Sequence, residues 1–117
     1  MLDLGSGLGV DSFIAAHRVG KNGRVVGLDI AKNEVKHAAK RAEARGISDY
    51  VSFVNADMEK MPFENNEFNA IISNGAFCLA PNKKAAFAEI FRVLKPGGRM
   101  SVSTSTMIVQ INQADGK

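Results

Sequence analysis

Short apolar runs alternate along the chain with longer amphipathic stretches, and turn residues separate the two. The short runs are aliphatic or β-branched, a pattern typical of buried strands. Strands are therefore predicted over Met1–Leu4, Arg24–Asp29, Tyr50–Asn55, Phe68–Ser73 and Arg99–Thr104. The longer stretches repeat apolar residues at helical spacing, which predicts helices over Val10–Val19, Lys32–Arg45 and Asn82–Leu94. Each predicted helix ends near a glycine, at Gly20, Gly46 and Gly97, as helix C-termini commonly do.

The order of these elements predicts an α/β fold. Strands and helices alternate, and parallel strands need crossover connections whose helices cover the faces of the sheet. A parallel sheet between two helical layers is therefore expected. The connection Asp57–Glu67 is polar and contains Pro62, so at most one helical turn is expected in it.

Composition restricts the class of protein. The length of 117 residues and the hydrophobic content of 45% suit a single compact domain over residues 1–117. The single cysteine, Cys78, excludes an intramolecular disulfide and favours a reducing compartment, hence the cytoplasm. The net charge of +3 is scattered, so nucleic acid is not expected as a partner. No apolar run approaches the roughly 20 residues of a membrane span. None of these features assigns an oligomeric state.

The two ends of the chain predict a truncated domain. A strand begins at Met1, and the last predicted strand is followed only by the short tail "INQADGK". A strand at a sheet edge leaves backbone groups unpaired, and natural domains normally cover them. We therefore expect the complete domain to be longer at both ends.

A glycine-rich turn joins the first predicted strand to the first helix. In "LDLGSGLGVD" the glycines Gly5, Gly7 and Gly9 alternate with other residues. Either the turn is merely tight, or a ligand approaches its backbone closely. A turn between a strand and a helix N-terminus is a frequent site for nucleotide-type ligands, so the second interpretation is favoured.

Two details indicate which ligand binds. A dinucleotide-binding turn has its third glycine at the sixth position, where this chain has Val10, so an NAD(P)-dependent oxidoreductase is the less favoured alternative. Asp3 would repel a pyrophosphate but attract an ammonium group. S-adenosylmethionine carries an α-ammonium group and a sulfonium, and fits this turn better. Asp3 could instead be a buried structural acid that binds turn amides.

Residues after the second and third predicted strands suit the rest of that ligand. Asp29 can accept hydrogen bonds from ribose hydroxyls, or it can cap the following helix. Ile30 offers an apolar face to an adenine ring. Asp57 can accept from the adenine amino group, or it can simply cap a turn, while Met58 can pack on the ring.

Four segments together resemble class I S-adenosylmethionine-dependent methyltransferases: "LDLGSGLG", "VVGLDI", "NADMEKMPFENNEFNAIISN" and "EIFRVLKPGGRM". The resemblance implies a Rossmann-like three-layer α/β/α sandwich with the sheet order 3-2-1-4-5. The family's sixth and seventh strands are expected to be missing here. The cofactor-binding residues expected on this basis are Asp3, Gly5, Ser6, Gly7, Gly9, Asp29, Ile30, Ala56, Asp57, Met58 and the backbone of Asn74.

Within that family the chain is most similar to small-molecule enzymes of the arsenite type, followed by sterol and quinone C-methyltransferases. Gly75 stands where the arsenite enzymes carry a cysteine, and Cys78 is better explained as a small apolar side chain. The expected activity is methyl transfer to a small molecule by in-line displacement. The alternative is a cofactor-binding module without turnover. No catalytic residue or metal ligand is assigned; His37 is expected on a solvated helix face and His17 on an inner one.

Overall fold

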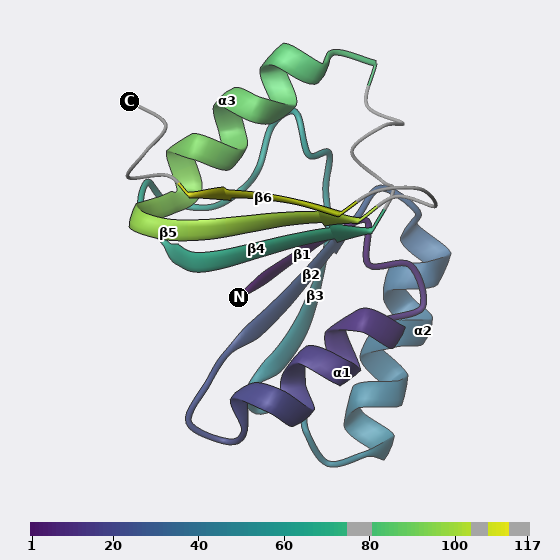
Figure 1. Ribbon diagram of the computed structural model, residues 1–117. Helices are drawn as coiled ribbons and strands as arrows, with labels where there is room; N and C mark the ends of the chain where they lie inside the picture. Colours follow the sequence, from purple (N-terminus) through teal and green to yellow (C-terminus); the bar gives the residue numbers. More distant parts are fainter. Residues whose placement is uncertain (75–80, 104–107, 113–117) are drawn as a thin grey trace.

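Six strands form one sheet in the computed structural model, which describes residues 1–74, 81–103 and 108–112 (Figure 1). The strand order is β3-β2-β1-β4-β5-β6. The elements are β1 (Leu2–Leu4), α1 (Val10–Val19), β2 (Val25–Asp29), α2 (Lys32–Ala44), β3 (Val51–Asn55), β4 (Phe68–Asn74), α3 (Lys83–Val93), β5 (Leu94–Ser103) and β6 (Ile108–Asn112). Strands β1 to β5 pair in parallel, so the predicted order 3-2-1-4-5 is confirmed.

Helices cover both faces of the sheet. Helices α1 and α2 lie on one face and α3 lies on the other (Figure 1). Side chains alternate between the faces along each strand: Val25 packs in the cluster beside α1, and Val26 packs in the cluster beneath α3. The predicted three-layer arrangement is therefore confirmed. It brings the carboxyl ends of β1, β2 and β3 together, where the glycine turn also lies.

The sheet carries one strand more than the sequence predicts. Strand β6 runs antiparallel to β5, with Ser103 opposite Ile108. The expectation that no sixth strand is present is wrong. The run "GRMSVSTSTMIVQ" contains no glycine, proline or asparagine between these two residues, so the strongest turn signals are missing and only a short Ser/Thr cluster separates the two strands. Thr104, the predicted last residue of the fifth strand, lies outside the described residues.

The junction between α3 and β5 also differs from the prediction. Helix α3 ends at Val93 and β5 begins directly at Leu94. Gly97 therefore does not end the helix. It lies inside β5 with a φ of 81°, where the pairing with β4 shifts register. The other two glycines follow their helices as expected, with Gly20 at the C-cap of α1 and Gly46 just after the C-cap of α2.

Gly27 in β2 allows the glycine turn to lie close to the sheet. A Cβ atom at this position would lie 2.5 Å from Cδ1 of Phe53 and 2.8 Å from Cβ of Ser6. We expect Gly27→Ala to lower the free energy of unfolding by about 1–3 kcal/mol, since the ring or the turn must move. Urea unfolding of the purified chain measures the change. The exposed Ser52→Ala in β3 is the control, and an unchanged midpoint for Gly27→Ala would contradict the expectation.

Candidate functional site

The glycine turn follows β1 and places its three glycines in left-handed backbone. The φ angles of Gly5, Gly7 and Gly9 are 70°, 53° and 90°, a region that other residues rarely adopt. The turn conformation alone therefore explains why glycine stands at these positions. Gly5 and Gly7 are partly exposed and leave the backbone open to a ligand, whereas Gly9 is buried and a Cβ atom there would lie 3.0 Å from Cζ of Phe53.

The amides of the turn are tied to the end of β2. The amides of Gly5 and Ser6 donate to the carbonyl of Leu28, at 2.8 and 3.1 Å. The amide of Gly7 donates to Oδ2 of Asp29 at 2.7 Å. The turn and the second strand thus form one rigid unit, as a preorganised binding site requires.

Asp29 lies at the centre of this unit. Its Oδ1 atom accepts from the amide of Ala31 at 2.8 Å, and its Oδ2 atom accepts from Gly7. The capping alternative is therefore right in part: Asp29 satisfies an amide at the start of α2, although the N-cap residue itself is Ala31. A carboxylate oxygen has two lone pairs, so both oxygens keep capacity for a further donor. The side chain is partly exposed.

Asp3 lies beneath the turn and is only 1% exposed. Its Oδ2 atom accepts from the hydroxyl of Ser12 at 2.7 Å. Burial raises the pKa of Asp3 to about 6, and the charges of Asp11 and Asp29 act in the same direction against the hydrogen bond from Ser12. The alternative interpretation of Asp3 was a buried structural acid that binds turn amides. Its partner in the structure is instead the hydroxyl of Ser12 in α1.

Buried polar atoms without a partner surround the turn. Within the described ranges, Oδ1 of Asp3, Oγ of Ser6 and Oγ of Ser73 have no hydrogen-bond partner. Such atoms cost free energy unless a ligand or water satisfies them. They adjoin the carboxyl ends of β1 and β4, since Leu4 pairs with Ser73. A positively charged ligand with hydrogen-bonding groups suits these atoms, because the carboxylate oxygen accepts and the two hydroxyl groups can accept or donate.

The residues after β3 lie beside those after β2. The amide of Ala56 donates to the carbonyl of Asp29 at 3.1 Å, and Nδ2 of Asn55 donates at 3.0 Å to the carbonyls of both Asp29 and Ile30. Ile30 is 71% exposed, a large apolar surface next to the site. Sequence reasoning missed Asn55, whose position at a strand end was its only signal.

The connection after β3 carries Asp57 and Met58. Oδ1 of Asp57 accepts from the amide of Glu59 at 2.9 Å, so the turn-capping interpretation holds for this oxygen. The side chain is exposed, and its second oxygen remains for a donor from outside. Met58 is partly buried and packs against the core beneath α3. No helical turn occurs in this connection, which is within the prediction.

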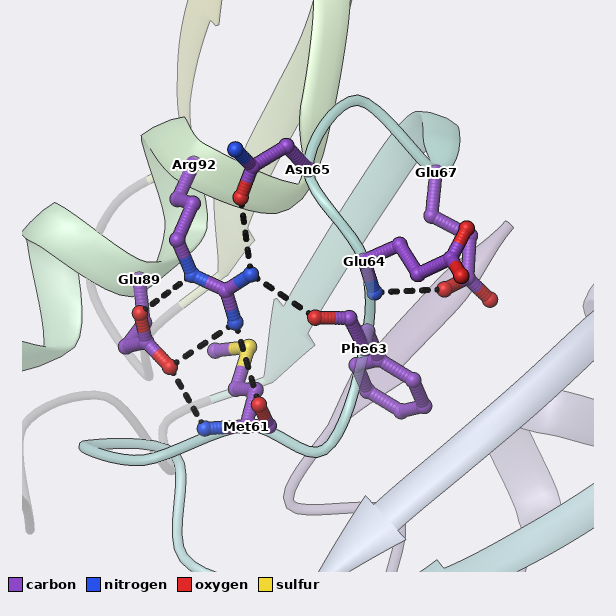
Figure 2. Close-up of polar contacts among 7 residues, drawn as sticks. All are labelled: Met61, Phe63, Glu64, Asn65, Glu67, Glu89 and Arg92. Atoms are coloured by element: carbon purple, nitrogen blue, oxygen red, sulfur yellow. Dashed lines mark hydrogen bonds and ion pairs between the residues drawn. The ribbon is translucent and has the colours of Figure 1, made fainter.

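Glu89 and Arg92 of α3 hold the same connection from the other side (Figure 2). The Arg92 guanidinium donates to the carbonyls of Met61 and Phe63 at 3.0 and 2.7 Å, and to Oδ1 of Asn65 at 3.0 Å. Glu89 accepts from Nε of Arg92 at 2.6 Å and from the amide of Met61 at 2.7 Å. The sequence alone assigned no role to Glu89 or Arg92.

The remaining expected residues lie apart from these contacts or outside the described residues. Asn74 ends β4, where its backbone pairs with Ser103. Gly75 and Cys78 fall outside the described residues. His37 is exposed as expected, whereas His17 is also exposed and does not line the inner face. At that point of α1 the inner face is formed by Ala15 and Ala16 instead.

Comparison with known proteins identifies the family. Residues 1–115 match a family described as a methyltransferase domain. The chain belongs to this family. The methyltransferase domain is 38% identical over 103 residues to the arsenite methyltransferase of Halobacterium salinarum. The aligned region covers 88% of this chain and 26% of that protein. It is 37% identical over 102 residues to the ubiquinone/menaquinone biosynthesis C-methyltransferase of Pseudomonas fluorescens, covering 87% of this chain and 40% of that one.

Solved structures support the same family. The geranyl diphosphate C-methyltransferase of Streptomyces coelicolor, solved with Mg²⁺, geranyl diphosphate and S-adenosyl-L-homocysteine, superposes with a TM-score of 0.82 at 27% identity. That match covers 88% of this chain and 37% of the other. The methyltransferase domain thus spans from about a quarter to two-fifths of the length of these relatives.

Two kinds of feature are absent from the residues that the structure describes in the methyltransferase domain. Among the helices that the structure describes, none has both the length and the apolar character that a membrane crossing needs. The described His, Asp and Glu side chains form no group of three or more that could hold a metal ion.

Proposed function

We propose that this methyltransferase domain binds S-adenosylmethionine across the carboxyl ends of β1, β2 and β3 and serves methyl transfer to a small-molecule acceptor. The observation that carries the proposal is the glycine turn held between two carboxylates, Asp29 at its outer side and the buried Asp3 beneath it. A negative surrounding of this kind suits an ammonium and a sulfonium and disfavours a pyrophosphate.

Each end of the cofactor has residues that suit it. Asp29 accepts from the ribose hydroxyls with the lone pairs that Gly7 and Ala31 leave unused. The exposed Ile30 and the partly buried Met58 offer apolar surfaces to the adenine ring. Asp57 accepts from the adenine amino group with its second oxygen. Asp3 attracts the α-ammonium group from beneath the turn.

The backbone of the site contributes to the methionine end. Gly5, Ser6, Gly7 and Gly9 shape the floor on which that end lies, and Ala56 keeps the end of β3 beside Asp29. The backbone of Asn74 at the end of β4 completes the set. Oγ of Ser6, buried and without a partner among the described residues, accepts from the bound ligand.

The chemistry needs little from the protein beyond alignment. When bound, the cofactor would supply a methyl group on a positively charged sulfur, to which an electron pair of the acceptor would bond as the carbon–sulfur pair returns to sulfur. The residues of the site orient the donor and exclude water, which contributes roughly 7–11 kcal/mol in favourable cases. No side chain is required as a nucleophile, in agreement with the exposed positions of His17 and His37.

The acceptor and the compartment are inferred from the relatives and the composition. The relatives reported above act on small molecules by their names, and we assign a small-molecule acceptor to this chain. The single cysteine favours a reducing compartment, so we assign the cytoplasm. The chain forms the cofactor-binding core of the enzyme.

Calorimetric titration of the purified chain tests the proposal. We expect binding of S-adenosylmethionine and of S-adenosylhomocysteine, with NAD binding at least about tenfold more weakly because Val10 replaces the third glycine of a dinucleotide turn. Tighter binding of NAD than of both adenosyl ligands would refute the proposal. Formation of S-adenosylhomocysteine from S-adenosylmethionine in the presence of arsenite or a quinone precursor then separates an enzyme from a binding module.

A further inference from the structure

The turn after β3 is held in place by α3 and not by its own chain neighbours alone. The carbonyl of Asp57 accepts from the amide of Lys60 at 3.0 Å, which closes a tight turn. Met61 follows directly, and both its amide and its carbonyl bind side chains of α3. The Asp57–Lys60 turn is thus held at its end through Met61, and also through Glu59, whose Oε2 atom accepts from the amide of Asn82 at the start of α3 at 3.1 Å.

The Met61 backbone is bound by the two members of one ion pair, Glu89 and Arg92. Nε and Nη2 of Arg92 donate to the two carboxylate oxygens of Glu89, at 2.6 and 3.0 Å. The remaining donors reach the connection at Met61, Phe63 and Asn65. The hydrogen bonds from Arg92 lower the pKa of Glu89, so that the carboxylate stays charged at neutral pH.

Only an arginine can make this set of contacts. The acceptors lie on different sides of one planar group, and Arg92 addresses four residues from its three nitrogen atoms. A lysine carries one compact charge on a flexible stem and cannot span them. The side chain of Arg92 is 32% exposed and that of Glu89 is 18% exposed, so water competes with the contacts only in part.

The residues held by this ion pair adjoin the proposed adenine surface. Met58 packs against the same core cluster that contains the buried Met61. Phe63 packs edge-on against Phe68 of β4, with ring centroids 5.0 Å apart. A displacement of Met61 would thus move Met58 and Asp57 together, since only the short turn separates them.

We propose that Arg92, oriented by Glu89, is a positioning residue that fixes the Asp57–Met61 turn and thereby sets the selectivity of the site for the adenine amino group. The inference rests on the proposed cofactor site. The contacts of Arg92 are to Glu89 and to the connection at Met61, Phe63 and Asn65. Its role is to keep the Asp57 carboxylate and the Met58 side chain where an adenine ring meets them.

The test compares Arg92→Lys with Val25→Ala in the full chain. Val25 is fully buried at the opposite end of β2 from Asp29, so its truncation lowers stability without touching the connection. Each protein is titrated with S-adenosylhomocysteine and with the analogue whose adenine amino group is replaced by an oxo group. Amide hydrogen exchange of residues 57–66 is measured without ligand.

The unchanged chain should favour the adenine ligand by about tenfold over the analogue. Arg92→Lys should reduce that preference to about twofold or less and speed exchange in the connection, while Val25→Ala keeps both. A preference retained in Arg92→Lys would overturn the inference even if stability fell. If the unchanged chain binds neither ligand, the proposed function fails and the inference that rests on it fails too, whatever the exchange data show; a retained preference in Arg92→Lys overturns the inference alone.

Discussion

Acidification from about pH 7.5 to about pH 5 should weaken S-adenosylhomocysteine binding about tenfold, because Asp3 takes up a proton over this range. Burial raises the pKa of this carboxyl to about 6 in the free protein. A charged Asp3 attracts the α-ammonium group of the ligand, and a neutral one does not. The affinity is therefore flat above about pH 7 and falls below about pH 6. Calorimetric titration across this range measures the effect.

The same proton should change stability in the opposite direction. The ordinary pKa of this carboxyl is 3.8, so between about pH 6 and pH 4 the folded chain binds a proton that the unfolded chain lacks. The free energy of unfolding then rises as the pH falls, by about 1.4 kcal/mol from about pH 7.5 to about pH 5. Urea unfolding at several pH values tests this sign.

The Asp3→Asn variant shows whether the pH dependence of affinity and that of stability come from Asp3 and not from other titrating groups. The amide oxygen still accepts from the hydroxyl of Ser12, but the charge is gone. The variant should show neither pH dependence and should bind the ligand about tenfold more weakly at neutral pH. Asp49→Asn, at an exposed position after α2, is the control and should behave like the unchanged chain. A pH-dependent stability with a pH-independent affinity would establish the structural interpretation of Asp3 in place of the ligand-binding one.

Asp29→Ala should lower the affinity for S-adenosylhomocysteine by about 100-fold. The substitution removes the acceptors for the ribose hydroxyls and also releases the amides of Gly7 and Ala31. The stability loss should be about 1–3 kcal/mol, since two backbone donors lose their partners. Titration and urea unfolding measure the two changes on the same preparation.

A ligand lacking the ribose 2′-hydroxyl distinguishes direct contact from loosening of the turn. The unchanged chain should bind the 2′-deoxy analogue about tenfold more weakly than S-adenosylhomocysteine. Asp29→Ala should bind both equally, because the lost hydroxyl has no acceptor there. If Asp29→Ala keeps the full preference, the carboxylate shapes the turn without touching the ribose.

The sequence predicted the fold where local pattern and tertiary structure agree. Strand and helix periods predicted a parallel sheet and placed α1 at its observed bounds, whereas the strand order came from the resemblance to the family. The turn glycines and the strand-end acids could be found because their chemistry is local: Gly7 and Asp29 lie at the ends of adjacent strands. Their contacts follow once the strand order is known.

Other features depend on partners that the sequence does not reveal. The reversal into β6 lacks the usual turn residues, and the shift in β5 leaves Gly97 within a strand. Asp3 was expected to bind the cofactor or, as the alternative, turn amides; neither expectation included its contact with Ser12 of α1, which the folded chain brings beside it. Glu89 and Arg92 look like an ordinary surface pair three residues apart on a helix. Their partners at Met61 and Phe63 lie about 30 positions earlier in the chain, a separation that only the folded chain closes.

The hydrogen bonds from Arg92 to carbonyl oxygens also affect which sequence changes this protein can tolerate. Because two of its loop contacts are to main-chain atoms at Met61 and Phe63, they do not depend on which side chains stand between and beside those positions. The exposed Lys60 and Glu64 can therefore be substituted, in evolution or in a designed library, while the backbone conformation of the segment is preserved. Side chains of the connection after β3 can therefore vary without a compensating substitution in α3.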